Sequence, residues 1–212
     1  MFPRLYAIAD TAALHQRGFD VALSVKAFVE GGAQVIQLRH KGHFSRSIYE
    51  QAKQAASFCR QSGVQFLIDD RADVALLLEC GLHVGQTDLP AHIARLLLQP
   101  PAILGLSTHN EQQVIEGDAL PVDYLALGPI FATTSKDNPD PVLGVDRLRQ
   151  LRRFTTKPLI AIGGISLDKA PEVLKAGADA VAVIRGLIPN RPSYSEMRAL
   201  VEAWRKGLGD MV

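Results

Sequence analysis

FLIDDRADVALLLECGLHVGQTDL, residues 66–89, contains two apolar runs separated by a helical pattern, and this pattern indicates the architecture. An apolar run ends at Asp69-Asp70-Arg71, a short helical pattern follows, and a second apolar run, Leu82 to Val84, ends at Gly85-Gln86-Thr87-Asp88. Two neighbouring strands that are joined by a helix run parallel, so both end at the same edge of one sheet. We therefore expect Asp70 and Asp88 to lie together at that edge.

The same alternation of apolar runs and helical segments continues along the chain. The predicted strands are Leu5–Ala9, Gln34–Leu38, Val64–Ile68, Leu82–Val84, Ile103–Leu106, Tyr124–Leu127, Leu159–Ile162 and Ala180–Ile184. Helical patterns lie near residues 20–31, 46–62, 72–80, 91–98, 111–117, 145–153, 167–176 and 194–206. Apolar strands that alternate with helices are typical of a parallel sheet covered on both faces.

Two α/β architectures share this local pattern, a (β/α)8 TIM barrel and an open doubly wound sheet. The eight strand–helix units favour the barrel. The first strand is followed by Asp10-Thr11 instead of the glycine-rich fingerprint that many open nucleotide-binding sheets carry. No linker or change in composition divides the chain, so we expect residues 1–212 to form a single barrel domain.

Composition limits the classes of function. The formal net charge of +1 argues against a nucleic-acid partner, because no basic excess attracts a polyanion. Neither of the two cysteines, Cys59 and Cys80, shows metal-ligand spacing, which is typical of buried thiols in a reducing compartment. No apolar run reaches membrane-spanning length, and residues 1–4 do not resemble an export signal. We expect a cytoplasmic protein without a membrane partner, and a homo-oligomer is left open.

In a barrel, every strand delivers its last residues to one rim, where residues remote in sequence converge. Carboxylates gathered there repel one another unless a cation lies between them, and a few oxygen ligands with room for water and phosphate are typical of Mg²⁺ sites. Asp70 and Asp88 are therefore predicted to bind Mg²⁺. The alternative is that both are solvated helix N-caps.

Polar groups also follow the second and fifth predicted strands. Alternation along the second strand places Gln37, Arg39 and Lys41 on one side, where two cations favour a polyanion such as diphosphate. A solvated strand end is the alternative. Ser107 and His109 follow the fifth strand; the imidazole is a candidate general base, but a helix cap or a structural donor is the more common role.

Two later segments are candidate phosphate sites. The long loop 128–144 carries Thr133, Thr134, Ser135 and Lys136, and its hydroxyls and ammonium suit phosphate oxygens, although a mobile surface loop has the same composition. After strands seven and eight come Gly163-Gly164 and Arg185, where backbone amides at a helix start are typical of an anion site. The residues alone thus predict a barrel enzyme that acts on phosphorylated substrates with Mg²⁺.

The chain resembles a known family, thiamine phosphate synthase (thiamine-phosphate pyrophosphorylase), and its relative thiazole tautomerase. The resemblance covers nearly the whole chain and rests on motifs that are specific in this order and spacing: LYAIAD at 5–10, QLRHK at 37–41, DDR at 69–71, GLHVGQTDLP at 81–90, LSTH at 106–109, DYLALGPIFATTSK at 123–136, IAIGGI at 160–165 and AGADAVAVI at 176–184.

The resemblance implies that hydroxymethylpyrimidine diphosphate is condensed with thiazole phosphate, or carboxythiazole phosphate, by a dissociative mechanism that releases pyrophosphate. It implies Mg²⁺ at Asp70 and Asp88, and it implies catalytic roles for Arg39, Ser107 and Lys136. The residues that it implies for the diphosphate substrate are Gln37, Leu38, Arg39, His40, Lys41, Asp69, Ser107 and Lys136. Those that it implies for the thiazole phosphate are Thr133, Thr134, Ser135, Gly164, Ile184 and Arg185.

Three residues depart from the family's usual pattern. Asp69 stands where Asn is usual and adds a negative charge near a diphosphate, so either the metal balances it or its side chain turns aside. Ser135 replaces Thr, and Arg185 replaces a common Ser. Two further functions remain alternatives, a metal-independent tautomerase and a non-catalytic binder of thiazole phosphate. Tautomerases often carry His directly after the Gly of strand six, where this chain has Pro129.

Overall fold

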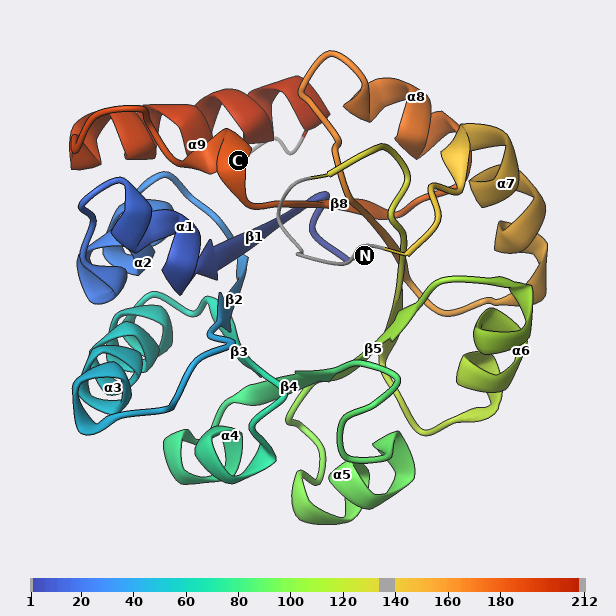
Figure 1. Cartoon of the computed structure of the whole chain (residues 1–212), viewed down its shortest axis with the longest axis horizontal. Coiled ribbons are helices and arrows are strands. Elements are labelled where there is room, and N and C mark those ends of the chain that lie inside the picture. The colour runs from blue at the N-terminus through green and yellow to red at the C-terminus, as the bar shows by residue number, and fades with distance from the viewer. Residues whose placement is uncertain (1, 134–139, 210–212) are drawn as a thin grey trace.

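In the part of the chain that the structure describes, eight short parallel strands pair in chain order and close into a barrel, which makes this a TIM barrel and excludes the open sheet (Figure 1). The computed structural model describes residues 2–133 and 140–209. The strands are β1 Leu5–Asp10, β2 Val35–Arg39, β3 Gln65–Asp69, β4 Gly81–Val84, β5 Leu104–Thr108, β6 Tyr124–Leu127, β7 Leu159–Ile162 and β8 Ala180–Val183. All eight predicted strands are present; β6 and β7 have the predicted bounds, and the ends of the others differ by at most two residues.

Helices surround this barrel (Figure 1). They are α1 Thr11–Gln16, α2 Val21–Glu30, α3 Arg46–Gln61, α4 Ala72–Leu78, α5 Ala91–Leu97, α6 Glu111–Ala119, α7 Gly144–Leu151, α8 Ala170–Lys175 and α9 Tyr194–Leu208, with 3₁₀ helices η1 Arg152–Phe154 and η2 Arg185–Leu187. Helix α1 was not predicted; it begins because the Asp10 carboxylate accepts a hydrogen bond from the Ala13 amide at 2.8 Å. Among the described residues, no helix has the length and apolar character needed to cross a membrane.

Alternation along the strands creates two apolar layers. Side chains such as Ile8, Leu67 and Ile160 fill the barrel interior. The intervening residues, Leu38 and Ile68 among them, face the helices and form the larger core between the strands and the helices. Burial of each such side chain stabilises the fold by about 1.5–3 kcal/mol.

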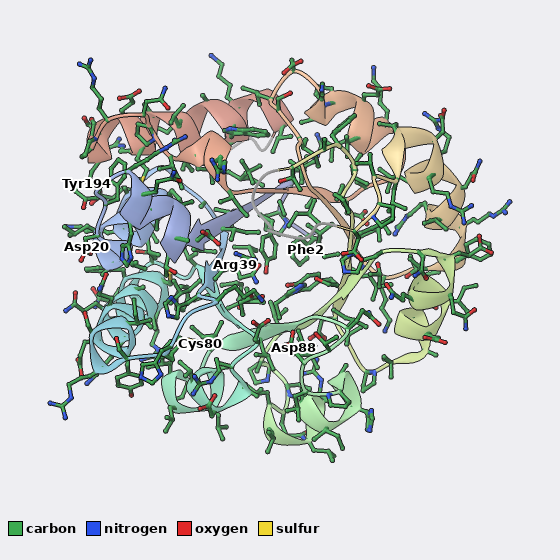
Figure 2. All side chains as sticks on the ribbon, in the orientation of Figure 1. Phe2, Asp20, Arg39, Cys80, Asp88 and Tyr194 are labelled. Carbon is green, nitrogen blue, oxygen red and sulfur yellow. The ribbon has the colours of Figure 1, made fainter. Side chains whose placement is uncertain are left out.

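The amino-terminal end of the barrel is closed by aromatic rings. Phe2, which is labelled in Figure 2, stacks on Tyr6 with ring centroids 6.3 Å apart, and its ring centroid lies 5.4 Å from that of Tyr124. A cavity opens at the opposite, carboxyl-terminal end, and Ala182 lies in its wall. The packing therefore places the open end of the barrel at the rim where the polar strand ends meet.

Candidate active site

A cavity of about 570 Å³ opens at the carboxyl ends of the strands. Both glycine-rich and charged strand ends contribute to its wall. The predicted site residues that line it are Gln37, Arg39, Lys41, Asp69, Asp70, Asp88, Ser107, Thr133, Gly164, Ile184 and Arg185. The structure thus brings together residues from six of the eight strand ends and from the loop after β6.

Two other predicted site residues that the structure describes, Leu38 and His40, are not in this wall. Leu38 is buried in the core between the strands and the helices, and His40 bonds to Thr11 Oγ1 at 2.7 Å and to the His43 carbonyl at 3.0 Å, outside the cavity. Both point away because successive side chains of a strand alternate in direction. Their side chains are therefore poorly placed for substrate contact. Thr134, Ser135 and Lys136 lie outside the described residues.

Five charged side chains at or just after the ends of β1, β2 and β3 form a row, which we call the charge row: Asp10, Arg39, Asp69, Lys41 and Asp70. All of them except Asp10 line the cavity. Arg39 donates to Asp10, and its Nε lies 3.8 Å from Asp69 Oδ2. Lys41 Nζ lies 2.8 Å from Asp69 Oδ2 and 2.5 Å from Asp70 Oδ2. Both cations are thus placed between carboxylates, and neighbouring members of the row carry opposite charge.

Asp70 adopts an unusual backbone conformation that directs it to the rim. Its φ is +61°, in the left-handed region that Asp tolerates better than most residues, and its amide donates to the His83 carbonyl of β4 at 2.8 Å. This turn separates the two consecutive carboxylates. Asp69 stays at the end of β3 with 5% of its surface exposed, whereas Asp70 is only half-buried.

Asp88 lies beside Asp70 at the same rim. Its Oδ2 accepts a hydrogen bond from the Gly85 amide at 2.7 Å, which fixes the loop after β4. The pKa of Asp70 is raised to about 6 by burial first, then by the charge of Asp69, with a further contribution from its hydrogen bond with Asp88; Lys41 opposes the shift. Two carboxyl groups in contact are the arrangement that a bound cation would relieve.

This arrangement fits Mg²⁺. The charge row together with Asp88 contains four carboxylates and two cations. The net charge of these six ionised groups is −2, which one divalent cation would balance. Among the described residues, no group of three or more His, Cys, Asp or Glu side chains converges as a metal site. A pair of carboxylates beside an open cavity is nevertheless typical of Mg²⁺, which keeps waters and phosphate oxygens as its other ligands.

A buried hydrogen-bonded network reaches the cavity from the barrel interior and was not predicted. Tyr6 and Tyr124 share a hydrogen bond at 2.7 Å between their hydroxyls, the Tyr124 hydroxyl lies 2.8 Å from His83 Nδ1, and His83 Nε2 lies 2.9 Å from Ser107 Oγ. Burial raises the pKa of both tyrosines, so both hydroxyls stay protonated. Ser107 therefore has a fixed partner behind it.

The sequence gives only a weak indication that His83 points into the barrel. It is a single polar residue within the apolar strand Gly81–Val84, and its inward direction becomes clear only once the barrel registers β4 against β5. Its partner Tyr124 lies far away in the sequence.

The other end of the cavity is built from backbone. Gly163 and Gly164, after β7, have φ values of +99° and +61°, and a Cβ on Gly164 would lie 2.3 Å from the Ala132 carbonyl oxygen. The 3₁₀ helix η2 begins at Arg185, directly after β8, and the first amides of a helix lack intrahelical acceptors. Glycine backbone, a helix start and a guanidinium together are suited to an anion.

His109 lines the cavity between these two regions. Its Nδ1 lies 2.6 Å from the Gly128 carbonyl oxygen, and Asp140 Oδ2 is 3.5 Å away. The carbonyl requires a proton on Nδ1, so a neutral His109 has Nε2 as its basic atom. His109 thus has the role of a structural hydrogen-bond donor to the Gly128 carbonyl. Its role as a general base stays a prediction.

Comparison with known proteins agrees with this geometry. Residues 5–187 match the family model TMP-TENI, described as thiamine monophosphate synthase. A thiamine-phosphate synthase of Koribacter versatilis is 46% identical over 88% of this chain and 89% of its own length, and one of Syntrophomonas wolfei is 37% identical over 95% and 96%. The structure of a thiamine phosphate pyrophosphorylase from Pyrococcus furiosus superposes with a TM-score of 0.82 at 32% identity, over 98% of this chain and 96% of that one. The chain belongs to the thiamine monophosphate synthase family.

Proposed function

We propose that this chain is a thiamine-phosphate synthase, a transferase that joins hydroxymethylpyrimidine diphosphate to thiazole phosphate and releases pyrophosphate. The observation that carries the proposal is that one cavity has two ends whose lining is suited to anions. The charge row and Asp88 form one end, and Gly164 with Arg185 forms the other. Family membership and relatives that carry this name support the same reaction.

The charged end is suited to the diphosphate. Arg39 and Lys41 supply the cations, and Asp70 with Asp88 would hold Mg²⁺. When bound, Mg²⁺ neutralises charge on the diphosphate and on the departing pyrophosphate. Lys136, in the loop after β6, is proposed to contact the same group.

The backbone-rich end is suited to the monoester phosphate of the thiazole. Gly164 permits close approach of a phosphate because it has no Cβ, and Arg185 offers a charge-assisted hydrogen bond. Thr133 lines the cavity here, and Thr134 and Ser135 are proposed to contribute hydroxyls. Binding at both ends fixes the distance between the two heterocycles, so reaction proceeds by positioning and without a covalent nucleophile.

Ser107 lies between the two ends, where the leaving oxygen and the pyrimidine would meet. Its hydroxyl is held by His83, whose ring is in turn held by Tyr124. A hydroxyl with one fixed partner is preorganised to donate to an oxyanion without reorganisation.

The test is an assay of the purified protein with both organic substrates, with and without Mg²⁺. A synthase releases pyrophosphate and forms thiamine phosphate when all three are present, and omission of any one abolishes product. Isomerisation of the carboxythiazole phosphate without metal would indicate a tautomerase, and binding without turnover would indicate a non-catalytic binder. Either result would contradict the proposal.

A further inference from the structure

Asp69 is the buried centre of the charge row. Its Oδ1 accepts a hydrogen bond from Gln37 Nε2 at 2.6 Å, and its Oδ2 is in ionic contact with Lys41 Nζ at 2.8 Å and lies 3.8 Å from Arg39 Nε. Oδ2 is fully enclosed, and beyond these two cations it has no hydrogen-bond partner among the described residues. The carboxylate is thus turned toward the cations of the row.

A buried carboxylate in this place has a definite cost for anion binding. Both cations on the diphosphate side already have carboxylate partners: Arg39 has Asp10, and Lys41 has Asp69 and Asp70. A diphosphate that arrives alone must compete with these carboxylates for the same ammonium and guanidinium, and it meets their uncompensated negative charge. A cation that neutralised these carboxylates would remove this barrier to diphosphate binding.

Asp69 also determines which way the Gln37 amide faces. A carboxylate can only accept hydrogen bonds, so Gln37 must direct its NH₂ group toward Asp69 and keep its carbonyl oxygen for a donor in the cavity. An asparagine at the same position has both a donor and an acceptor and would permit either orientation. Asp69 therefore constrains both Gln37 and Lys41 before any substrate is bound.

We propose that Asp69 is a positioning residue that makes diphosphate binding conditional on the divalent cation. By holding Lys41 and adding a negative charge beside Asp70, Asp69 favours the cation and disfavours the free anion. Once Asp70 is engaged by the cation, Asp69 remains as the partner that keeps Lys41 at the rim. The inference rests on the proposed function, because it assumes that the charge row faces a diphosphate.

The experiment measures binding of inorganic pyrophosphate by isothermal titration calorimetry, with and without Mg²⁺, to the full chain and to Asp69→Asn. Without metal, Asp69→Asn is expected to bind pyrophosphate about tenfold more tightly than the unmodified chain, because one buried negative charge is lost. Mg²⁺ alone should bind the variant more weakly. The factor by which Mg²⁺ increases the affinity for pyrophosphate should therefore be lower in the variant than in the unmodified chain, by about tenfold or more.

Asp73→Asn is the matched control. It makes the same change of charge in α4, where the carboxylate is exposed and paired with Arg71, outside the cavity wall. This variant should retain the metal dependence of the unmodified chain. Mg²⁺ binds pyrophosphate in solution, so all proteins are compared at identical concentrations of both, and circular dichroism checks that each variant is folded.

Two results would overturn the inference, and they are distinguishable. Equal metal dependence in the unmodified chain and in Asp69→Asn would remove the role of Asp69 and leave the proposed function in place. Failure of the unmodified chain to bind pyrophosphate under any condition would remove the proposed function, and the inference with it.

Discussion

Lys41 Nζ lies 2.5 Å from Asp70 Oδ2, so the carboxylate expected to hold a metal ion is in contact with an ammonium in the described structure. The pair brings β2 and the turn after β3 together at the rim. Lys41 lowers the pKa of Asp70, yet burial and the charge of Asp69 outweigh it and leave that pKa at about 6. Protons, Lys41 and Mg²⁺ therefore compete for one carboxylate.

This competition predicts a pH dependence of metal binding. Because Asp70 has a pKa of about 6 in the metal-free protein, its affinity for Mg²⁺ should be nearly constant above pH 7 and fall as the pH drops through 6. Calorimetric titration with MgCl₂ at several pH values measures this. An affinity that is unchanged between pH 7.5 and pH 5 would contradict it.

The stability of the metal-free protein should change in the opposite direction. A carboxyl whose pKa is raised on folding contributes stability that is present below its unfolded pKa and is lost as pH rises through about 6. Asp73 provides an internal reference in a ¹³C NMR titration, because its hydrogen bond from Arg71 lowers its pKa. Asp70 should titrate well above Asp73 in the same sample.

Asp88→Asn should lower turnover by about a hundredfold or more while the fold is retained. The asparagine keeps an oxygen that can accept from the Gly85 amide, so the loop after β4 stays in place, but one of the two negative charges is lost. Pyrophosphate release measured over a range of Mg²⁺ concentrations checks the rate, and thermal unfolding checks the fold. Unchanged turnover would remove Asp88 from the metal site.

Gly164→Ala should cost more stability than Gly63→Ala. Both residues have similar positive φ values, +61° and +66°, so both alanines pay about 1–2 kcal/mol for the left-handed conformation. A Cβ on Gly63 meets nothing within 4 Å, whereas one on Gly164 would lie 2.3 Å from the Ala132 carbonyl oxygen. Urea unfolding measures both costs, and equal values would show that the loop after β6 yields freely. We also expect Gly164→Ala to weaken binding of thiazole phosphate.

The barrel and its rim were predictable from sequence because both depend on local pattern. Strands that alternate with helices determine the architecture, and the positions of Asp70, Asp88 and Arg185 shortly after their strands follow from the strand boundaries. What could not be predicted depends on direction and on distant partners. The sequence Asp69-Asp70 does not indicate which of the two carboxylates turns inward to Gln37. The contact of His83 with Tyr124 joins β4 and β6 and could be predicted only from the closed barrel.

The two thiols should be unreactive in the folded protein. Burial is the main cause that raises the pKa of Cys59 to about 12 and that of Cys80 to about 11, so neither is a thiolate at pH 8. A disulfide reagent added at pH 8 should therefore label no thiol quickly in the native protein and two after unfolding in urea. Rapid labelling of the native protein would show that the core between α3 and α4 opens readily.

Tyr124→Phe should destabilise the protein by about 1–3 kcal/mol, because it removes a buried hydroxyl that lies within hydrogen-bond distance of both Tyr6 and His83. The Tyr124 hydroxyl lies 2.7 Å from that of Tyr6 and 2.8 Å from His83 Nδ1, in the barrel interior. Tyr194→Phe is the matched control: its hydroxyl accepts from the Asp20 amide at 3.2 Å at the surface, where water can replace it, so the change should stay within about 0.5 kcal/mol. Urea unfolding of both variants separates the two cases, and equal costs would mean that the buried network contributes no more than a surface contact.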